Sequence, residues 1–499
     1  MAGRSAPPRA AALVESLRGL GYSTSTAVAD IVDNSIAAGA ETVDIRFHWV
    51  GDASWISILD DGRGMSAKEL DSAMRLGDRN PLDERTPGDL GRFGLGLKTA
   101  SFSQARSLTV ASRSEGVAVE CLRWDLDELA ASADDGWYLL EGPRGGSDGL
   151  LSPLEGMSSG TLVLLEKLDR LVTPGFGSDD FLEVIDRVEQ HLAMTFHRYL
   201  EGSRPRLRLL LNGSQVSPWD PFMTDHPSKP WCRPEIELAT GRVRVQCHVL
   251  PHRDKLSAQE QARAAGPDGW NSAQGFYVYR NERLIVAGSW LGLGSGRHWT
   301  KDEAHRLARI RLDITNDADT DWKLDIRKST ARPPVWLRKP LTRLAEETRT
   351  RARQVFAHRG SPSATTRAGP VAMAWQAVRT SGATRYAIAR DHEAVRSLMA
   401  AAPQLAGHIE LVLRVIEETV PVQRIWLDTA EDRDTPLTGF AGEPDDAIVG
   451  VLRSMYRVLV AKNGLSSAEA RARLTRTEPF DQYPALVAAL GQATPADGV

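Results

Sequence analysis

The sequence predicts an α+β protein, and three observations lead to this class. Helical patterns at 10–40 precede one group of strand patterns, and a second group follows at 204–345. The remaining chain, 371–499, is mostly helical in pattern. A length of 499 residues exceeds one ordinary hydrophobic core, so the chain is expected to fold as about two to four domains.

Composition narrows the class of protein. Hydrophobic residues make up 42% and charged residues 25%, which is usual for globular proteins, and a net charge of −4 means that any basic surface must be local. Cys121, Cys232 and Cys247 form no CxxC pair, which argues against a disulfide framework or a zinc knuckle. Since neither a membrane-length apolar run nor a signal-peptide core is seen, we expect a cytoplasmic protein without membrane contact.

The first group of elements is expected to open with two helices separated by "GYSTST". Ser23 or Thr24 can cap the second helix, and Gly39 can end it. Strands are expected at 43–50 and 54–60, and Ser66 with Glu69 forms a capping box for the next helix. A Gly- and Pro-containing loop follows and is long enough to be a mobile lid. Later elements are a helix at 97–105, strands at 107–113, 117–124 and 160–168, and a helix near 180–202.

The second group has strand patterns at 206–213, 243–250, 275–286 and 307–314, followed by a helix after "ARPPVW". The stretch "GSPSATTRAGP" has the composition of a linker. These patterns predict four segments: 1–203, 204–359, the linker 360–370, and 371–499.

Four short motifs carry residues suited to chemistry. They are Asp30 with Asn34 on one helix face, Asp60 with Gly62 and Gly64 after a strand, "GRFGLGLK" from Gly91 to Lys98, and Gly160 with Thr161. A carboxylate at a strand end can accept a hydrogen bond from an exocyclic amine such as that of adenine, and glycines permit close approach to a flat ring. A glycine-rich loop before a helix offers N–H groups to phosphates, Asn oxygen suits Mg²⁺, and a nearby carboxylate can deprotonate a water.

Each motif is weak alone, and their order gives them weight. "GRFGLGLK" is not a Walker A loop, because Leu97 stands where that loop needs its Lys. Together, "ADIVDNSIAAGA", "LDDGRGM", "GRFGLGLKTAS" and "GT" resemble the N, G1, G2 and G3 boxes of the GHKL (Bergerat-fold) ATPases, which include gyrase, Hsp90, histidine kinases and MutL. The bacterial MORC-like and MutL-like branch is the most similar one. The resemblance implies a Bergerat α/β-sandwich ATPase domain, an S5-like transducer domain, and a mostly helical C-terminal domain of unknown role.

Residue roles follow from the resemblance box by box. It implies that Asp60 binds adenine with support from Gly62, Gly64 and Thr161, that Asn34 holds Mg²⁺, and that Asp30 is the general base. It also implies a phosphate lid built from Gly91, Gly94, Gly96, Leu97 and Lys98. "LDIRKSTARPP" places Lys328 where such transducers carry a lysine to the γ-phosphate.

Two positions depart from the family pattern. The family base is usually Glu, and Asp30 is one methylene shorter. The Asp common three residues after the Asn is Ala37 here. Three interpretations of the shorter Asp30 remain open. A shifted helix brings the attacking water within its reach, or hydrolysis is slow, or the protein is a nucleotide-gated scaffold that does not hydrolyse ATP. A histidine kinase is a further alternative, disfavoured because kinases lack a base one turn before the Asn and lack the transducer lysine.

The resemblance further implies an ATP-gated homodimeric clamp that acts on DNA in a bacterial restriction or anti-phage setting, with a partner nuclease or other defence protein. One local feature favours DNA: the helix after "ARPPVW" is rich in cations, namely Arg338, Lys339, Arg343, Arg349, Arg351, Arg353 and Arg359. The alternative is a solvated helix face balanced by Glu346 and Glu347.

Overall fold

The computed structural model describes two compact units, residues 1–360 and 361–499. The residues described are 9–19, 21–77, 96–132, 136–224, 226–228, 231–238, 242–252, 255–315, 319–322, 331–357, 372–380, 383–423, 425 and 446–491. The expected change of domain at 203/204 falls inside the first unit, and the four predicted segments stay predictions. The α+β class is confirmed.

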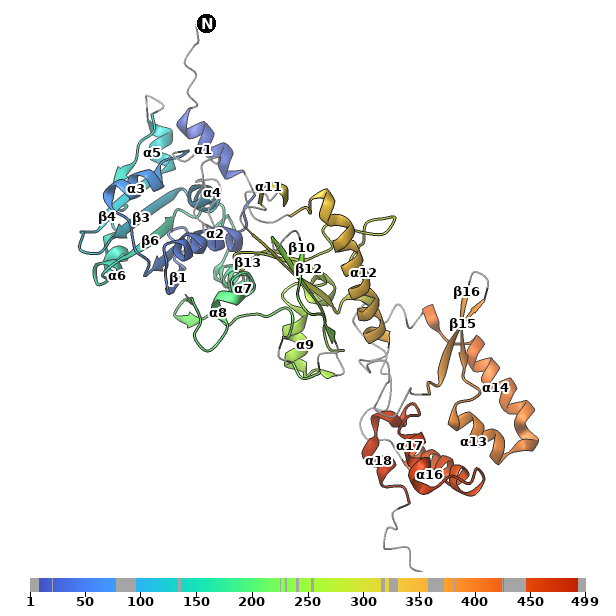
Figure 1. Cartoon of the computed structure of the whole chain (residues 1–499). Coiled ribbons are helices and arrows are strands. Elements are labelled where there is room, and N and C mark those ends of the chain that lie inside the picture. Colours follow the sequence, from blue (N-terminus) through green and yellow to red (C-terminus); the bar gives the residue numbers. More distant parts are fainter. Residues whose placement is uncertain are drawn as a thin grey trace, which may run out of the picture. The chain divides into compact units, whose positions relative to one another are not determined.

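The first unit begins with a sheet to which the described residues contribute eight strands, in the order β5-β4-β3-β6-β2-β1-β7-β8 (Figure 1). Neighbouring strands are antiparallel except for the parallel pair β1 and β7. Their bounds are β1 Thr42–His48, β2 Trp55–Asp60, β3 Ser107–Arg113, β4 Glu120–Asp125, β5 Leu140–Glu141, β6 Gly160–Glu166, β7 Arg208–Leu211 and β8 Ser214–Gln215.

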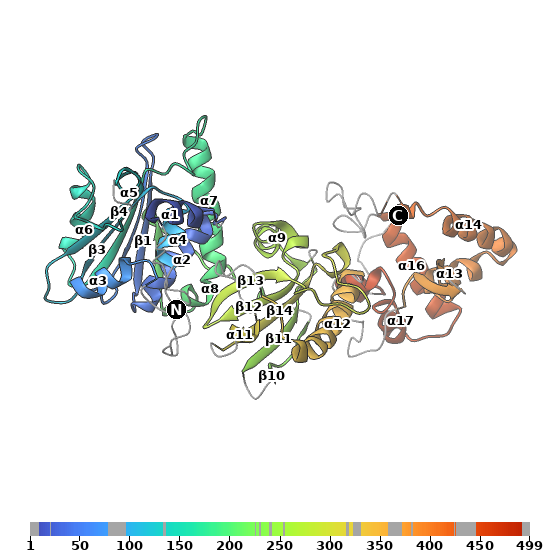
Figure 2. The same ribbon diagram turned by 90° about the horizontal axis from the view of Figure 1, so that it is seen from above.

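Helices cover this sheet unequally. One face carries the larger core, and α1, α2, α4 and α7 lie on that side (Figure 2). The opposite face carries a small core in which Leu162 and Leu164 of β6 pack on Leu151 and Leu154, since alternate strand residues point to opposite faces. The helices are α1 Ala10–Arg18, α2 Thr24–Ala37, α3 Ala67–Met74, α4 Gly96–Phe102, α5 Leu126–Ala131, η1 Asp148–Leu151, α6 Ser152–Glu155, α7 Ser178–Thr195 and α8 His197–Leu200.

Local sequence signals explain where the site-bearing helices start. The Ser23 hydroxyl accepts a hydrogen bond from the Thr26 N–H at 3.2 Å, so Ser23 is the cap of α2. The predicted capping box of Ser66 and Glu69 opens α3 and is confirmed. α2 ends at Ala37, and Gly39 follows with a φ of 76°, a backbone conformation that favours glycine.

A second sheet completes the first unit, with described strands in the order β10-β11-β14-β12-β13 and β9 paired to β11. Long helix α12 packs on it through apolar residues that include Leu337, Leu341 and Leu344. The strands are β9 Trp231–Cys232, β10 Ile236–Leu238, β11 Val243–Val249, β12 Gly275–Arg280, β13 Arg283–Ser289 and β14 Ala308–Ile314. The helices are α9 Ala258–Ala265, α10 Gly269–Ser272, η3 Glu303–His305, α11 Asp319–Trp322 and α12 Val335–Ala357.

The second unit contains a β-hairpin that the sequence patterns did not predict, β15 Trp375–Thr380 paired with β16 Ala383–Ile388. The other described elements are helical: α13 Glu393–Ala401, η5 Pro403–Leu405, α14 Ala406–Glu418, α16 Asp446–Ala461, α17 Ser467–Leu474, η6 Phe480–Gln482 and α18 Pro484–Ala488. Across the described parts of both units, no helix has the combination of length and apolar character that crossing a bilayer requires.

Candidate functional site

A buried carboxylate stands at the end of β2. Asp60 is 5% exposed, and it accepts hydrogen bonds from the Ser35 hydroxyl at 2.8 Å and the Gly62 N–H at 3.0 Å. Burial raises the pKa of Asp60 above its usual range, and the hydrogen bonds from Ser35, Gly62 and the Thr161 backbone oppose this rise without cancelling it. The result is an oriented acceptor in a poorly solvated place, which suits a polar group of a ligand.

The backbone after Asp60 approaches its surroundings too closely for side chains. A Cβ at Gly62 would lie 2.8 Å from the Ala38 Cβ and 3.0 Å from Asp60 Oδ1. Gly64 has a φ of 67°, and a Cβ there would lie 1.8 Å from the Arg113 carbonyl oxygen. Both positions therefore require glycine, and Gly62 keeps the space beside the Asp60 carboxylate open.

The neighbouring strand β6 supplies the other wall. Thr161 pairs with Asp60 across the two strands, and its hydroxyl lies 2.9 Å from the Ser112 hydroxyl. Ser112 also accepts from the Met65 N–H at 2.8 Å. The turn after Asp60, β3 and β6 are thus tied by one small hydroxyl network. Ser35 and Ser112 were not singled out from sequence, although Ser35 directly follows Asn34 in "DNS".

Helix α2 carries a second set of polar residues one turn away. Asn34 is exposed, its Nδ2 donates to the Asp30 carbonyl at 3.1 Å, and none of the described residues donates to its carboxamide oxygen. Such an oxygen suits Mg²⁺, which keeps several waters and takes few protein ligands. In the described residues, no group of three or more His, Cys, Asp or Glu side chains is placed to hold a metal ion.

Asp30 and Asp33 are buried and share one cation. Asp30 is 4% and Asp33 2% exposed, and Arg283 is 4% exposed. Arg283 Nη2 lies 3.2 Å from Asp30 Oδ1, while its Nε lies 2.8 Å from the Asp33 carboxylate. Tyr22 donates its hydroxyl to the other Asp30 oxygen at 3.1 Å. Asp30 and Asn34 therefore differ in surroundings, since Asn34 faces solvent and Asp30 faces a guanidinium from the second sheet.

A tight turn places Arg283 in this position. Asn281 and Glu282 connect β12 to β13 with φ values of 47° and 66°, the backbone sense that two-residue hairpin turns prefer. The Tyr199 hydroxyl of α8 donates to the Asn281 carbonyl at 2.5 Å, which fixes the turn against the first sheet's helices. Burial alone would lower the pKa of Arg283, but Asp33 and Asp30 outweigh it and raise the pKa above its ordinary value. Sequence reasoning missed Arg283, because the residue lies far from every motif.

The predicted lid residues are only partly described. Gly96 begins α4, Leu97 packs against the large core, and the buried Lys98 ammonium donates to the Ala73 and Arg75 carbonyls at 2.8 Å each. Lys98 thus satisfies carbonyl groups at the C-terminal end of α3. Its predicted contact with phosphate stays a prediction. Gly91, Gly94 and Lys328 lie outside the described residues.

The predicted basic helix, α12, is less uniformly basic than its sequence. Arg349 stacks on Trp290 and Trp299, with its guanidinium carbon 4.6 and 4.9 Å from the ring centroids, and pairs with Asp302 at 3.4 Å. Burial lowers the pKa of Arg349. The expectation that Arg349 presents its charge to DNA is wrong, because the side chain is packed into the second sheet's surroundings.

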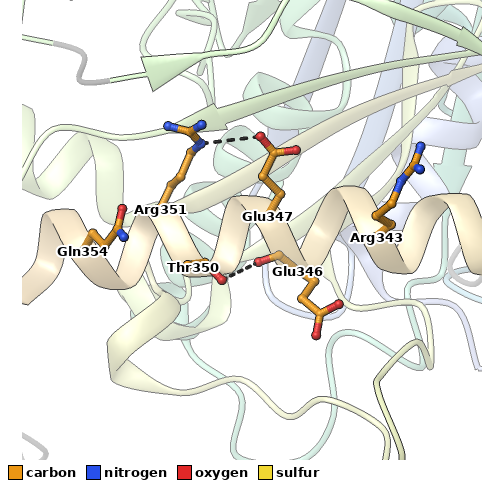
Figure 3. A pocket seen from close by; sticks show the side chains of 6 residues that line it. All are labelled: Arg343, Glu346, Glu347, Thr350, Arg351 and Gln354. Atoms are coloured by element: carbon orange, nitrogen blue, oxygen red, sulfur yellow. Dashed lines mark hydrogen bonds and ion pairs between the residues drawn. The ribbon is translucent and has the colours of Figure 1, made fainter.

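A shallow groove follows the exposed side of α12 (Figure 3). It mixes charges: Arg351 lies 3.5 Å from Glu347 and also covers the ring of Trp231 at 4.7 Å. The groove is lined by Arg343, Glu346, Glu347, Thr350, Arg351 and Gln354. The cations of α12 that are exposed in the described residues are Arg338, Lys339, Arg343, Arg351 and Arg353.

The class of this domain follows from the fold and from sequence comparison. Residues 22–161, which contain α2, the Asp60 turn and Thr161, match the family described as histidine kinase-, DNA gyrase B- and HSP90-like ATPase. The chain is also similar to ATPase morc-1 of Caenorhabditis elegans, with 24% identity over 257 aligned residues. That similarity covers 43% of this chain and 29% of the relative, so the match spans less than a third of the relative's length. The predicted resemblance to MORC-like GHKL ATPases is confirmed.

Proposed function

We propose that this protein binds ATP with Mg²⁺ at the Asp60 and Asn34 site and hydrolyses it. The observation that carries the proposal is the arrangement on α2, where Ser35 donates to the Asp60 carboxylate, Asn34 directly precedes Ser35, and Asp30 lies one turn before Asn34. The ATPase family match over 22–161 supports the same reaction.

Each residue has a distinct task in this proposal. Asp60, oriented by Ser35 and Gly62, accepts a hydrogen bond from the adenine amine. Asn34 contributes its carboxamide oxygen to the metal, which neutralises phosphate charge when bound. Asp30 orients the attacking water and takes its proton. Gly64 and Thr161 keep the backbone and the hydroxyl network beside the adenine in place.

The lid and the second sheet would complete the site. We assign the phosphate contacts to the N–H groups of Gly91, Gly94 and Gly96, with Leu97 and Lys98 opening the helix that follows them. Lys328 contacts the γ-phosphate and thereby distinguishes ATP from ADP. This contact makes the second sheet responsive to nucleotide, and it underlies the ATP-gated homodimeric clamp.

The clamp is proposed to act on DNA in the cytoplasm, in a bacterial restriction or anti-phage setting with a partner nuclease or other defence protein. The exposed cations of α12 support a phosphate-binding surface, and the three unpaired cysteines agree with a reducing compartment. Arg349 has no part in this surface, for the packing reason given above.

Calorimetry and phosphate release test the nucleotide proposal together. Asp60→Asn turns one acceptor oxygen into a donor facing the adenine amine, so ATP affinity should fall at least about tenfold while the protein stays folded. Asp52→Asn, which changes an exposed carboxylate, is the matched control and should bind as wild type. Unchanged affinity in Asp60→Asn would contradict the site. Binding without phosphate release in wild type would instead support the nucleotide-gated scaffold.

A further inference from the structure

Arg283 connects two parts of the molecule that are separate in sequence. It is the first residue of β13 in the second sheet, and both of its carboxylate partners lie on α2 of the first sheet's core. β13 also packs along α7 (Figure 1). Any displacement of the β12–β13 hairpin is therefore felt directly at Asp30.

The two ion pairs are unequal. The Arg283 Nε to Asp33 distance is 2.8 Å, and the Nη2 to Asp30 distance is 3.2 Å. Asp33 thus holds the closer pair. Buried ion pairs are poor evidence of stabilisation, because the cost of removing both charges from water offsets much of their attraction. One guanidinium at the start of β13 that contacts two residues of α2 is instead suited to coupling the hairpin to that helix.

We propose that Arg283 is a latch that restrains hydrolysis by holding Asp30 in the resting protein, an inference that rests on the proposed role of Asp30 as general base. In this pair the Asp30 carboxylate oxygen is directed at the guanidinium instead of at a water. Asp33 is the anchor that keeps Arg283 in place when Asp30 is released. Movement of the hairpin with the second sheet frees Asp30, so Arg283 is a positioning residue and makes no contact with nucleotide.

Three variants test the latch in the full-length protein by steady-state ATP hydrolysis. Arg283→Met removes the charge at similar length, and kcat should rise at least fivefold with KM changed by less than threefold. Arg283→Lys keeps the positive charge but replaces the planar, forked guanidinium with a compact ammonium on a different stem, so it should hold Asp30 less precisely and give a smaller rise. Asp33→Asn leaves Arg283 to Asp30 alone, so kcat should fall at least threefold. Opposite signs for Arg283→Met and Asp33→Asn are the signature of the latch.

Controls separate this signature from a general loss of structure. Arg187→Met on α7 removes an exposed arginine and should leave kcat unchanged. Adding Asp30→Ala to Arg283→Met should abolish the gain, because the released group is then missing. Thermal melting and calorimetric binding of a non-hydrolysable ATP analogue establish that each variant is folded, and if Arg283→Met does not fold, Arg283→Lys decides.

The outcomes that overturn the latch are distinct from failure of the ATPase proposal. If wild type hydrolyses ATP and neither Arg283 variant exceeds it, or if Arg283→Met and Asp33→Asn lower kcat alike, Arg283 is a structural bridge only. If wild type and both Arg283 variants bind the analogue but none releases phosphate, hydrolysis itself is absent and the latch falls with it.

Discussion

Burial makes the ionised form of Asp60 unfavourable, and this follows from its position at the candidate binding site. Burial raises its pKa, while Ser35, Gly62 and Thr161 each offer a hydrogen bond to the charged form. Burial outweighs these three hydrogen bonds, so a further donor, such as the amine of a ligand, would stabilise the charged form of Asp60. A buried carboxylate of this kind therefore contributes to ligand binding and not to the stability of the fold.

The sign of the Asp60 shift predicts a pH dependence of folding. Above the unfolded pKa of 3.8, the folded state binds more protons than the unfolded state, up to the raised folded pKa. The free energy of unfolding that Asp60 contributes should therefore decrease as pH rises through this window. Urea denaturation of wild type and Asp60→Asn across mildly acidic to neutral pH measures the difference between the two. A difference that is flat or increases with pH would contradict the assignment.

Helix α2 distributes three tasks over its turns. Ser35 serves Asp60, Asn34 faces solvent, and Asp30 with Asp33 faces Arg283. The spacing of Asp30 and Asn34 was readable from sequence, because positions four apart share a helix face. The ion-pair partner of Asp30 could not be predicted from the sequence, because Arg283 lies 253 positions further along the chain and reaches Asp30 from a hairpin. Local patterns predict which residues share an element, and tertiary packing decides which charge meets them.

Asp30 and Asn34 should separate chemistry from binding. Asp30→Ala removes the water-orienting carboxylate, so hydrolysis should fall at least about 100-fold with analogue affinity within a few-fold of wild type. Asn34→Ala removes a metal ligand, so both Mg²⁺-dependent binding and hydrolysis should fall. Phosphate release and calorimetry with and without Mg²⁺ provide the measurements. Asp30→Glu retains the carboxylate and is expected within about tenfold of wild-type activity; an Asp30→Ala protein as active as wild type would refute the base assignment.

The interface between α7 and β13 adds a titrating group. Burial and the nearby Arg283 lower the pKa of His191 on α7 to about 4, with Asp33 acting in the opposite direction. Between about pH 6.5 and 4 the unfolded chain binds more protons than the folded one, so stability falls as pH falls, by roughly 2–3 kcal/mol in total. Urea denaturation should show a shallower acid loss in His191→Gln. If the free energy of unfolding depends on pH identically in the variant and wild type, the lowered pKa of His191 is contradicted.

Helix α12 should respond differently on its two sides. Arg349→Ala breaks stacking on Trp290 and Trp299 and should destabilise the protein by about 1–2 kcal/mol. Reversing the exposed Lys339, Arg343 and Arg353 should instead leave stability unchanged and weaken DNA binding. The slope of log affinity against log salt should decrease by about one for each lost phosphate contact. Titration of a labelled duplex at several salt concentrations measures it, and an unaltered slope would assign these cations to solvent.

At the scale of the whole molecule, the Arg283 ion pairs are among several contacts that join the elements of the two sheets in the first unit. The α+β class and the four motifs were predictable, because strand alternation and glycine turns are local signals. The β15–β16 hairpin was missed in a segment whose other patterns are helical, since a short strand with few neighbours leaves little periodic signal. Among the contacts between the elements of the two sheets, that of Arg283 with α2 reaches the candidate site, and a contact of Lys328 with the γ-phosphate is proposed.

Sedimentation velocity of the full chain with nucleotide tests the ATP-gated clamp most directly. A ligand shifts a conformational equilibrium only by its differential affinity for the two states, and ADP lacks the phosphate that Lys328 would contact. A charge-assisted contact of this kind contributes about 1.5–3 kcal/mol. We expect a non-hydrolysable ATP analogue to convert wild type to dimer, ADP to leave it monomeric, and Lys328→Ala to bind the analogue without dimerising. Equal dimer fractions with ADP and the analogue, or a Lys328→Ala protein that dimerises as wild type does, would contradict the account.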